Sequence, residues 1–334
     1  MREAHLDYLV CPDCQRPLTV ADAALRHDDR IITGTLACDS CQGTFPILGG
    51  IPRFVPLNNY ADGFGFQWNK HALTQHDSYS NSTVSKDRFF NETRWPHELA
   101  GETILEVGCG SGRFTAPALS TGAMVVATDL SDAVDANYRC HDAVENLLLV
   151  QSDIYRMPFR RETFDKVFCL GVLQHTPDVE LSFTTLAGFL KTGGRIVTDV
   201  YDRRSGMLGI LELFYRTYYW FRPITHRLPS KLLYRLVSAY VRFMWPIARL
   251  INRIPVVGRK INRMLLIVDY RGRYDLSEEL LKEWSILDTF DLLSPVYDQR
   301  QTIATFRDWF RSAPLTDIDV HYGYNGIEGR ATKC

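Results

Sequence analysis

The pattern of apolar residues predicts five short strands in the middle of the chain. Largely apolar runs cover residues 104–107, 125–128, 147–150, 164–169 and 195–200, with room between them for turns and helices. Short apolar runs bounded by turns are typical of strands that are buried on both faces. Strands that alternate with helical segments favour a parallel sheet. The middle of the chain is therefore expected to form an α/β sheet.

The first of these strands runs into three glycines, Gly108, Gly110 and Gly112. Glycine has no Cβ, so its backbone can turn sharply and approach a ligand closely. A strand, a glycine turn and a helix together cradle nucleotides in open α/β sheets. A dinucleotide site would place its third glycine three residues after the second, and that position holds Arg113. The spacing therefore indicates a different nucleotide.

Acidic residues accompany this turn. Glu106 lies two residues before the first glycine, and Asp129 and Asp153 follow the second and third predicted strands. These residues resemble the motifs of class I S-adenosylmethionine-dependent methyltransferases, whose first motif is an acid followed by Gly-x-Gly-x-Gly. The resemblance implies a Rossmann-like α/β fold, with a seven-stranded sheet whose last strand is antiparallel.

The resemblance also implies roles for single residues. Asp129 would accept hydrogen bonds from both ribose hydroxyls of S-adenosylmethionine, because a carboxylate offers two oxygens to a diol. Asp153 would face the adenine amino group. The cofactor-binding residues implied in this way are Glu106, Gly108, Cys109, Gly110, Gly112, Asp129, Leu130, Asp153, Ile154 and Leu170.

Methyl transfer from a sulfonium requires mainly that nucleophile, methyl group and sulfur are aligned. A general base is needed only when the acceptor loses a proton. His175, just after the fourth strand, is a candidate base because imidazole titrates near neutral pH, although it could equally be a structural turn residue beside the pocket. Tyr297 is a second catalytic candidate. Residues 169–172 replace the Asn-Pro-Pro-Tyr motif that the family uses on base amines, which favours an oxygen or carbon acceptor on a small molecule, glycan or lipid-linked compound.

Four cysteines near the N-terminus form two Cys-x-x-Cys pairs separated by 23 residues: Cys11 and Cys14, then Cys38 and Cys41. Two pairs at this spacing predict one structural zinc site of four thiolates. Two disulfides are disfavoured in the reducing compartment that we expect, and a redox pair is disfavoured because no βαβ pattern surrounds it. Residues 1–56 also resemble the zinc ribbon of small proteins that activate methyltransferases.

These patterns divide the chain into four parts. Residues 1–56 form the zinc ribbon, 57–100 a connector, 101–200 with 301–334 the methyltransferase core, and 201–300 a largely helical insertion after the fifth strand. Aromatic residues in the connector either close the cofactor pocket or pack the connector onto the core. They are Phe64, Phe66, Trp68 and Tyr79.

The insertion is strongly basic, with 15 Lys or Arg against two acids, Glu212 and Asp269, between residues 203 and 273. Five basic residues fall within about 40° of one another on a predicted helix: Lys231, Arg235, Arg242, Arg249 and Arg253. On the opposite side fall Leu233, Val237, Tyr240, Met244 and Ile251. Such a helix either lies on an anionic membrane surface or is a substrate lid whose apolar face packs on the core.

Two other function classes stay open. An RNA-modifying methyltransferase would use the basic insertion, but an isoelectric point near 6.8 and the lack of an RNA-binding motif make nucleic acid the less favoured partner. A non-catalytic S-adenosylmethionine-binding scaffold would be unusual in keeping every cofactor position. The sequence has no signal-peptide pattern at its start, so we expect a cytoplasmic protein, with peripheral attachment to the inner face of the membrane if the helix binds lipid. The oligomeric state does not follow from the sequence.

Overall fold

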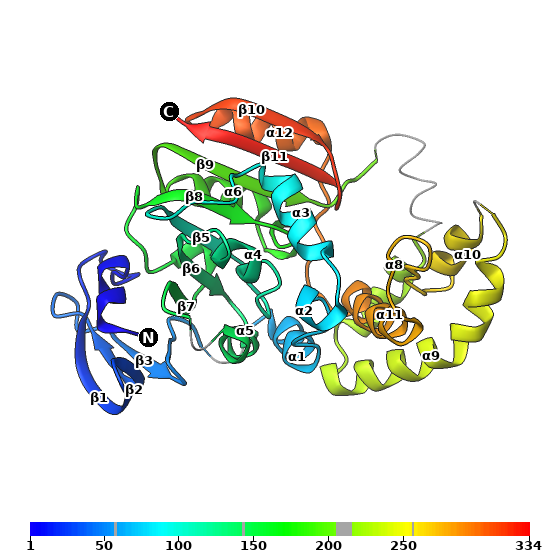
Figure 1. Ribbon diagram of the computed structural model, residues 1–334, viewed down its shortest axis with the longest axis horizontal. Coiled ribbons are helices and arrows are strands. Elements are labelled where there is room, and N and C mark those ends of the chain that lie inside the picture. The colour runs from blue at the N-terminus through cyan, green and yellow to red at the C-terminus, as the bar shows by residue number, and fades with distance from the viewer. Residues whose placement is uncertain (57–58, 142–143, 205–215, 256) are drawn as a thin grey trace.

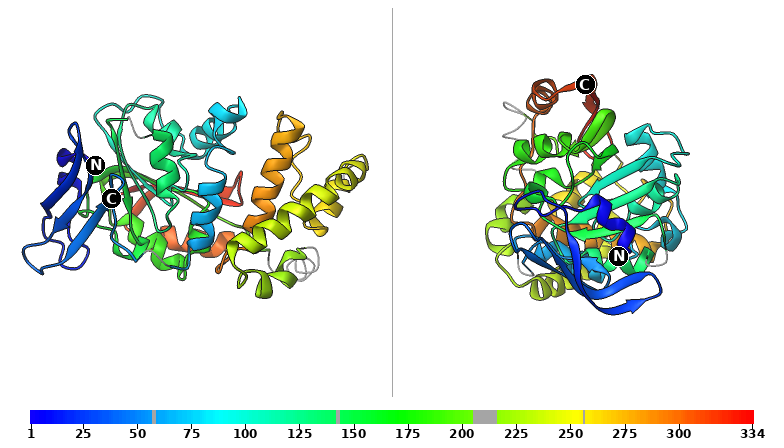
Figure 2. Two further views of the ribbon diagram at one scale, coloured as in Figure 1. Left: turned by 90° about the horizontal axis from the view of Figure 1, so that it is seen from below. Right: turned by 90° about the vertical axis from the view of Figure 1, so that its left-hand side faces the viewer.

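The computed structural model describes residues 1–56, 59–141, 144–204, 216–255 and 257–334. Glu212 of the basic insertion lies outside these residues. Three parts follow one another along the long axis of the molecule: a small sheet, a large sheet with flanking helices, and a group of helices (Figure 1). The same order is visible from below (Figure 2).

The large sheet has seven strands in the order β10-β11-β9-β8-β5-β6-β7. The strands β5 to β9 pair in parallel, and β11 pairs antiparallel with both β9 and β10. This confirms the predicted Rossmann-like sheet with one antiparallel strand. The strands are β5 (Thr103–Val107), β6 (Met124–Asp129), β7 (Leu147–Gln151), β8 (Phe164–Cys169), β9 (Leu190–Val200), β10 (Leu315–Tyr322) and β11 (Ile327–Lys333).

Helices cover both faces of this sheet, and alternate side chains of each strand meet them because successive Cβ atoms point to opposite faces. Leu105 and Val167 pack with α6 (Val179–Ala187) and α12 (Ile303–Ser312). Ile104 and Phe168 pack in the second cluster, on the opposite face. The helices of that cluster are α3 (Val84–Thr93), α4 (Thr115–Leu119) and α5 (Val134–His141).

The N-terminal residues form a four-stranded antiparallel sheet in the order β1-β2-β3-β4. Its apolar side chains share one core with the large sheet, through contacts such as those of Leu9 and Ile47 in the cluster that contains Phe159. Arg53 also donates to the Gln151 side chain at 2.9 Å and pairs with Asp135 at 2.5 Å. The small sheet is thus fixed to the β7 edge. Its strands are β1 (Thr19–His27), β2 (Arg30–Ala37), β3 (Thr44–Leu48) and β4 (Ile51–Pro52).

The segment between β9 and α12 is largely helical, as predicted. The helices in the described part of this segment are α8 (Tyr218–Thr225), α9 (Ser230–Ile251), α10 (Gly258–Met264) and α11 (Glu278–Leu293). Residues of α8, α9 and α11 form a core of their own. The connector helices α1 (Asp62–Lys70) and α2 (Asp77–Ser80) lie between these helices and the large sheet (Figure 1). The Trp284 side chain of α11 donates a hydrogen bond to the carbonyl of Thr74 at 2.7 Å, which joins the inserted helices to the connector.

Candidate active site

A cavity of 450 Å³ lies where the carboxyl ends of β5, β6, β8 and β9 meet the connector and the helices α8, α10 and α11. This volume is in the usual range for sites that bind small molecules. The crevice beyond the carboxyl ends of parallel strands is also where open α/β sheets bind ligands. The fold therefore places the predicted cofactor turn at a cavity of suitable size.

The three glycines of this turn have positive φ angles, but they contact different parts of the protein. Gly108 and Gly110 line the cavity, and a Cβ on Gly108 would lie 2.2 Å from a methyl carbon of Val172. Gly112 does not line the cavity. A Cβ there would lie 2.6 Å from the Asn137 side-chain oxygen, so this glycine allows the turn to pack on α5. Only the first two are therefore placed to approach a cofactor.

Asp129 ends β6 and lines the cavity, as predicted. The Gly110 amide donates to its Oδ2 at 2.9 Å. The amide and hydroxyl of Ser131 donate to Oδ1 at 2.8 and 2.7 Å. Burial raises the pKa of this carboxyl, while these donors oppose that rise. The bonds hold the carboxylate in one orientation beside the glycine turn. Oδ1 already accepts two hydrogen bonds and Oδ2 one, so Oδ2 is the oxygen that keeps a site for a further donor.

Glu106 lies behind the turn rather than at the cavity. Its side chain is buried and accepts a hydrogen bond from the Thr115 hydroxyl at 2.5 Å, which joins β5 to the start of α4. Burial raises its pKa to about 8. The geometry gives Glu106 a positioning contact with the helix that follows the turn.

The other predicted cofactor residues divide in the same way. Cys109, Leu130, Ile154 and Leu170 line the cavity. Asp153 is not among the lining residues, and its carboxylate caps the following short helix by accepting from the Tyr155 amide at 3.0 Å. The adenine contact expected of Asp153 stays a prediction.

His175 lines the cavity and is held by one hydrogen bond, from Nδ1 to the carbonyl of Tyr297 at 2.8 Å. A carbonyl can only accept, so Nδ1 carries the proton and Nε2 is left as the proton acceptor of the ring. Burial lowers the pKa of His175 to about 4. The imidazole is therefore neutral at physiological pH, and it is a weak base in the free protein.

The Tyr297 side chain packs edge-on against Tyr60, with ring centroids 5.3 Å apart, and is not among the residues that line the cavity. Its backbone carbonyl orients His175. Tyr297 was expected to be catalytic, but the contact that the structure shows is the one by which its backbone positions His175.

The structure adds a cavity residue that the sequence pattern did not single out. Asp291 of α11 lines the cavity and accepts a hydrogen bond from the Gln67 side chain at 3.3 Å. Burial, reinforced by the nearby charge of Asp288, raises the pKa of Asp291 to about 7. A carboxylate with this pKa is suited to general-base work at neutral pH. The sequence could not single out Asp291, because it is one acid on a helix more than 100 residues from the glycine turn.

Arg113, next to the glycine turn, is a second unexpected cavity residue. It donates to the Ser85 hydroxyl at 2.9 Å and to the Gln75 side chain at 2.6 Å, and it lies over the ring of Trp284. Within the described residues no carboxylate comes within ion-pair distance of it. Burial, with the nearby charge of Arg88, lowers its pKa to about 10. The guanidinium of Arg113 is thus a cation in the cavity that forms no ion pair within the described residues.

The connector supplies aromatic side chains to this cavity. Phe64 and Trp68 of α1 line it, and a Cβ on Gly110 would lie 3.4 Å from the indole nitrogen of Trp68. Phe66 packs instead on Tyr234 and Phe290, and Tyr79 is exposed. Of the two expectations for the connector, Phe64 and Trp68 fit closure of the pocket and Phe66 fits packing.

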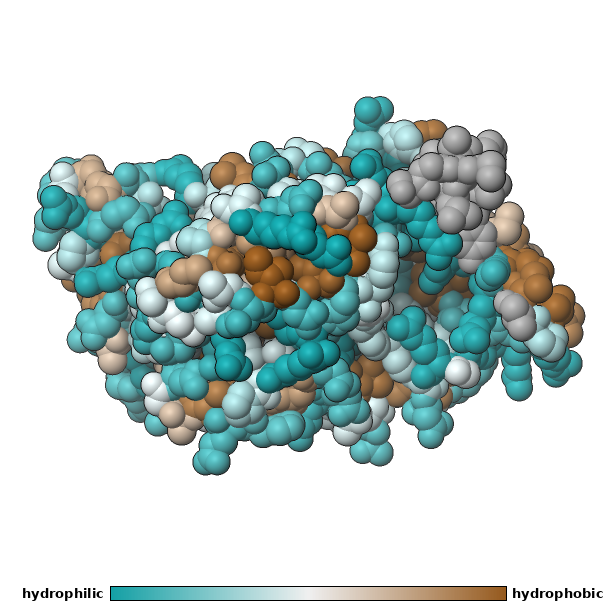
Figure 3. All heavy atoms as spheres, turned by 90° about the horizontal axis from the view of Figure 1, so that it is seen from above, coloured by the Kyte–Doolittle hydropathy of each residue, from teal (hydrophilic) through white to brown (hydrophobic). Residues whose placement is uncertain are grey.

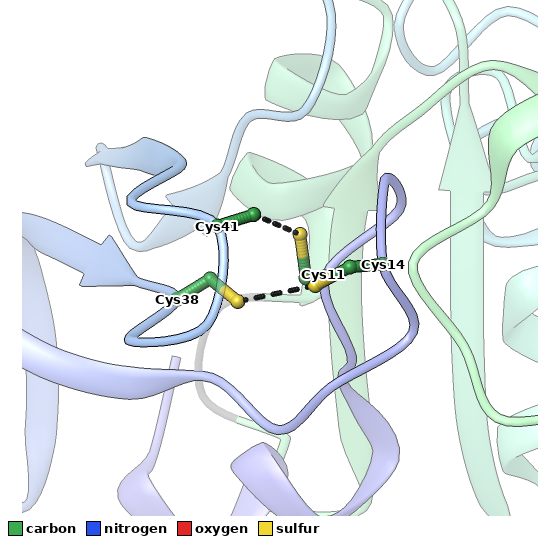
Figure 4. Close-up of side chains that lie close together, drawn as sticks. All are labelled: Cys11, Cys14, Cys38 and Cys41. Atoms are coloured by element: carbon green, nitrogen blue, oxygen red, sulfur yellow. Dashed lines mark hydrogen bonds between the residues drawn. The ribbon is translucent and has the colours of Figure 1, made fainter.

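The four cysteines come together at one end of the small sheet (Figure 4). Their sulfur atoms all lie within 4.8 Å of one another, with Cys11 and Cys41 at 3.5 Å and Cys14 and Cys38 at 3.4 Å. A tetrahedral zinc with Zn–S bonds of about 2.3 Å requires sulfur atoms roughly 3.8 Å apart. The donor set and its spacing fit zinc.

Part of the chain matches known proteins. Residues 105–198 match the family model of a methyltransferase domain. The chain is similar to ubiquinone biosynthesis O-methyltransferases from Xanthomonas euvesicatoria, 32% identical over 109 residues, and from Pseudomonas paraeruginosa, 30% identical over 145 residues. The matches cover 32% and 40% of this chain, and 46% and 62% of those relatives, so the chain spans about half their length.

Among solved structures, the CurJ carbon methyltransferase is similar with a TM-score of 0.43 and 13% identity, covering 83% of this chain and 61% of that one. The phosphoethanolamine N-methyltransferase 1 of Haemonchus contortus has a TM-score of 0.35 and 18% identity, covering 43% and 33%. These values are too low to support an argument, and the fold rests on the strand order described above.

Proposed function

We propose that the protein is an S-adenosylmethionine-dependent methyltransferase. The observation that carries the proposal is the hydrogen bond from Gly110 to Asp129 at the wall of the cavity, within residues that match the methyltransferase domain. Gly108 and Gly110 would admit the cofactor to the turn, and Asp129 would accept a hydrogen bond from the ribose through Oδ2. When bound, the cofactor supplies a methyl group on a positively charged sulfur.

The acceptor atom that we favour is oxygen, with carbon as the second choice. Oxygen is supported by the relatives named ubiquinone biosynthesis O-methyltransferases and by the absence of the Asn-Pro-Pro-Tyr motif. Tyr270, Tyr274 and Trp284 also line the cavity, and their rings give this part of its wall an aromatic surface. The acceptor is accordingly a small molecule, a glycan or a lipid-linked compound.

A hydroxyl acceptor has a proton to lose, and Asp291 and His175 are the two cavity groups that could accept it. The pKa of Asp291 near 7 leaves about half of it as carboxylate at neutral pH. His175 has its lone pair on Nε2, but its pKa of about 4 makes it the weaker base. We therefore propose Asp291 as the base, with His175 orienting the acceptor through Nε2.

The zinc site has a structural role in this proposal. The ion would be bound by Cys11, Cys14, Cys38 and Cys41, and four thiolates leave no open position for a substrate. The small sheet contributes no residue to the lining of the cavity, which supports a role in stability rather than in chemistry.

The test is transfer of a radiolabelled methyl group from S-adenosylmethionine into separate small-molecule, lipid and RNA extracts. The proposal expects label in the small-molecule or lipid fraction, and markedly less with the Asp129→Ala protein at limiting cofactor. Label in the RNA fraction alone would identify an RNA-modifying enzyme. Cofactor binding without transfer to any fraction would favour the non-catalytic scaffold.

A further inference from the structure

A row of apolar side chains on α9 is exposed. Its members recur every three or four residues and therefore lie on one stripe of the helix. Their exposed fractions range from 36% for Tyr240 to 72% for Phe243. The exposed row consists of Leu232, Leu236, Tyr240, Phe243, Ile247 and Leu250, with Ile254 just beyond the helix.

A different stripe of the same helix already packs on the protein. Leu233, Val237, Val241, Trp245 and Ala248 are buried in the core that α9 shares with α11. At 100° per residue this buried stripe is centred more than 100° away from the exposed row. A lid that packs on the core accounts for the buried stripe but leaves the exposed row unexplained.

Neighbouring elements extend the apolar surface. Trp220, Phe221 and Ile224 of α8 are exposed, and so are Met264 at the end of α10 and Leu265 after it. Hydrophobic residues lie among polar ones at the end of the molecule where these helices stand (Figure 3). Single exposed apolar residues are normal on proteins, whereas a contiguous row marks a surface that binds something apolar.

Positive charge borders the row. Lys231, Arg235, Arg242, Arg249 and Arg253 lie together on α9 and just after it, roughly 110° around the helix from the exposed row. The described ion pairs include none of these five residues. Long basic side chains can extend from the edge of an apolar face to lipid headgroups. This combination of an apolar row and a basic edge is complementary to an anionic lipid surface.

Each helix in the described part of the chain is too short or too polar to cross a membrane. The exposed row covers one side of α9, whose opposite parts carry charge or pack on α11. A helix of this kind lies in the plane of the interface with its apolar row among the acyl chains.

We propose that the exposed row of α9, with its basic edge, docks the protein on an anionic lipid surface. Lipid docking is separate from methyl transfer, and it is inferred from the exposed residues of α9 and not from the cavity. It would also bring a lipid-linked acceptor close to α11 and the segment before it, which supply Trp284 and Tyr270 to the cavity.

The test is co-sedimentation of the full chain with vesicles at low salt. One set is phosphatidylcholine alone, and the other is phosphatidylcholine mixed with phosphatidylglycerol. We expect binding to the mixed vesicles, release at high salt, and little binding to phosphatidylcholine alone. No binding to the mixed vesicles at low salt would overturn the proposal.

Two double variants separate the apolar and the basic contributions. Phe243→Ser with Leu250→Ser removes the two most exposed members of the row and should weaken binding at least about tenfold. Arg242→Gln with Arg249→Gln should weaken it about fivefold for each charge removed.

The matched control is Leu25→Ser with Leu181→Ser, which removes two exposed leucines from β1 and α6 and should leave binding unchanged. Equal losses in the control would refute the assignment to α9. Sedimentation velocity without lipid tests the alternative that a second copy of the chain covers the exposed row. If the intact chain self-associates and the Phe243→Ser, Leu250→Ser protein does not, the row is an interface between copies of the chain and the proposal fails.

Discussion

His175 donates a hydrogen bond from its Nδ1–H group to the backbone carbonyl of Tyr297, which lies 122 residues further along the chain. The distance from Nδ1 to the carbonyl oxygen is 2.8 Å. The bond joins the loop after β8 to the segment that returns from α11 to the large sheet. Gln299 strengthens the same junction, since its amide donates to the carbonyl of Gln174 at 2.8 Å. The wall of the cavity therefore depends on contact between the core and the inserted helices, and both must be folded for His175 to take this orientation.

Asp129→Ala is expected to weaken S-adenosylmethionine binding by about tenfold or more, because hydrogen bonds to a charged group contribute about 1.5–3 kcal/mol each. Isothermal titration calorimetry measures the change. Asp308→Ala, at an exposed position of α12, is the matched control and should bind normally. Unchanged affinity in Asp129→Ala, or tighter binding of a nicotinamide dinucleotide, would refute the cofactor assignment.

Asp291→Asn is expected to lower the rate of methyl transfer and to change its pH profile. The carboxyl must be deprotonated to act as a base, so the wild-type rate should rise with pH through about 7 and then level off. The Asn protein should lack that rise while retaining cofactor affinity. If His175→Gln removes the rise and Asp291→Asn does not, the two roles are reversed.

Glu106→Gln is expected to alter how stability depends on pH. The folded-state pKa of Glu106, about 8, lies above the value near 4.5 of an unfolded chain, so the folded protein binds the extra proton between these values. The free energy of unfolding of the wild type should therefore fall as pH rises through this window. Denaturant unfolding across that range should show a smaller fall for Glu106→Gln. An identical pH dependence in the two proteins would count against the raised pKa.

Purified protein is expected to contain one zinc per chain, and Cys38→Ser should lose it. Elemental analysis under reducing conditions measures the metal. Since the small sheet shares a core with the large sheet, the loss should also lower the melting temperature of the whole protein. Cys140→Ser, at a cysteine of α5 far from the cluster in sequence, is the control and should keep both metal and stability. Absence of stoichiometric metal in the wild type would rule out the zinc site.

Local patterns were sufficient for much of this protein. Apolar runs predicted β5 to β9, because the burial of short strands depends on residues that are neighbours in sequence. The resemblance to class I methyltransferases, which rests on the glycine turn and the acids after the strands, pointed to Asp129 as a residue of the site. The cysteine spacing likewise predicted four sulfur atoms in one cluster. These features require no knowledge of how distant segments pack.

The tertiary structure decided what depends on distant neighbours. The sequence placed Tyr240 and Leu233 on one broad apolar face, but packing against α11 buries Leu233 and leaves Tyr240 exposed. Asp291 became a cavity residue with a raised pKa because α11 lies beside α1 and is buried there. Burial and pKa depend on everything that surrounds a side chain, and those surroundings come from parts of the chain that no local pattern brings together.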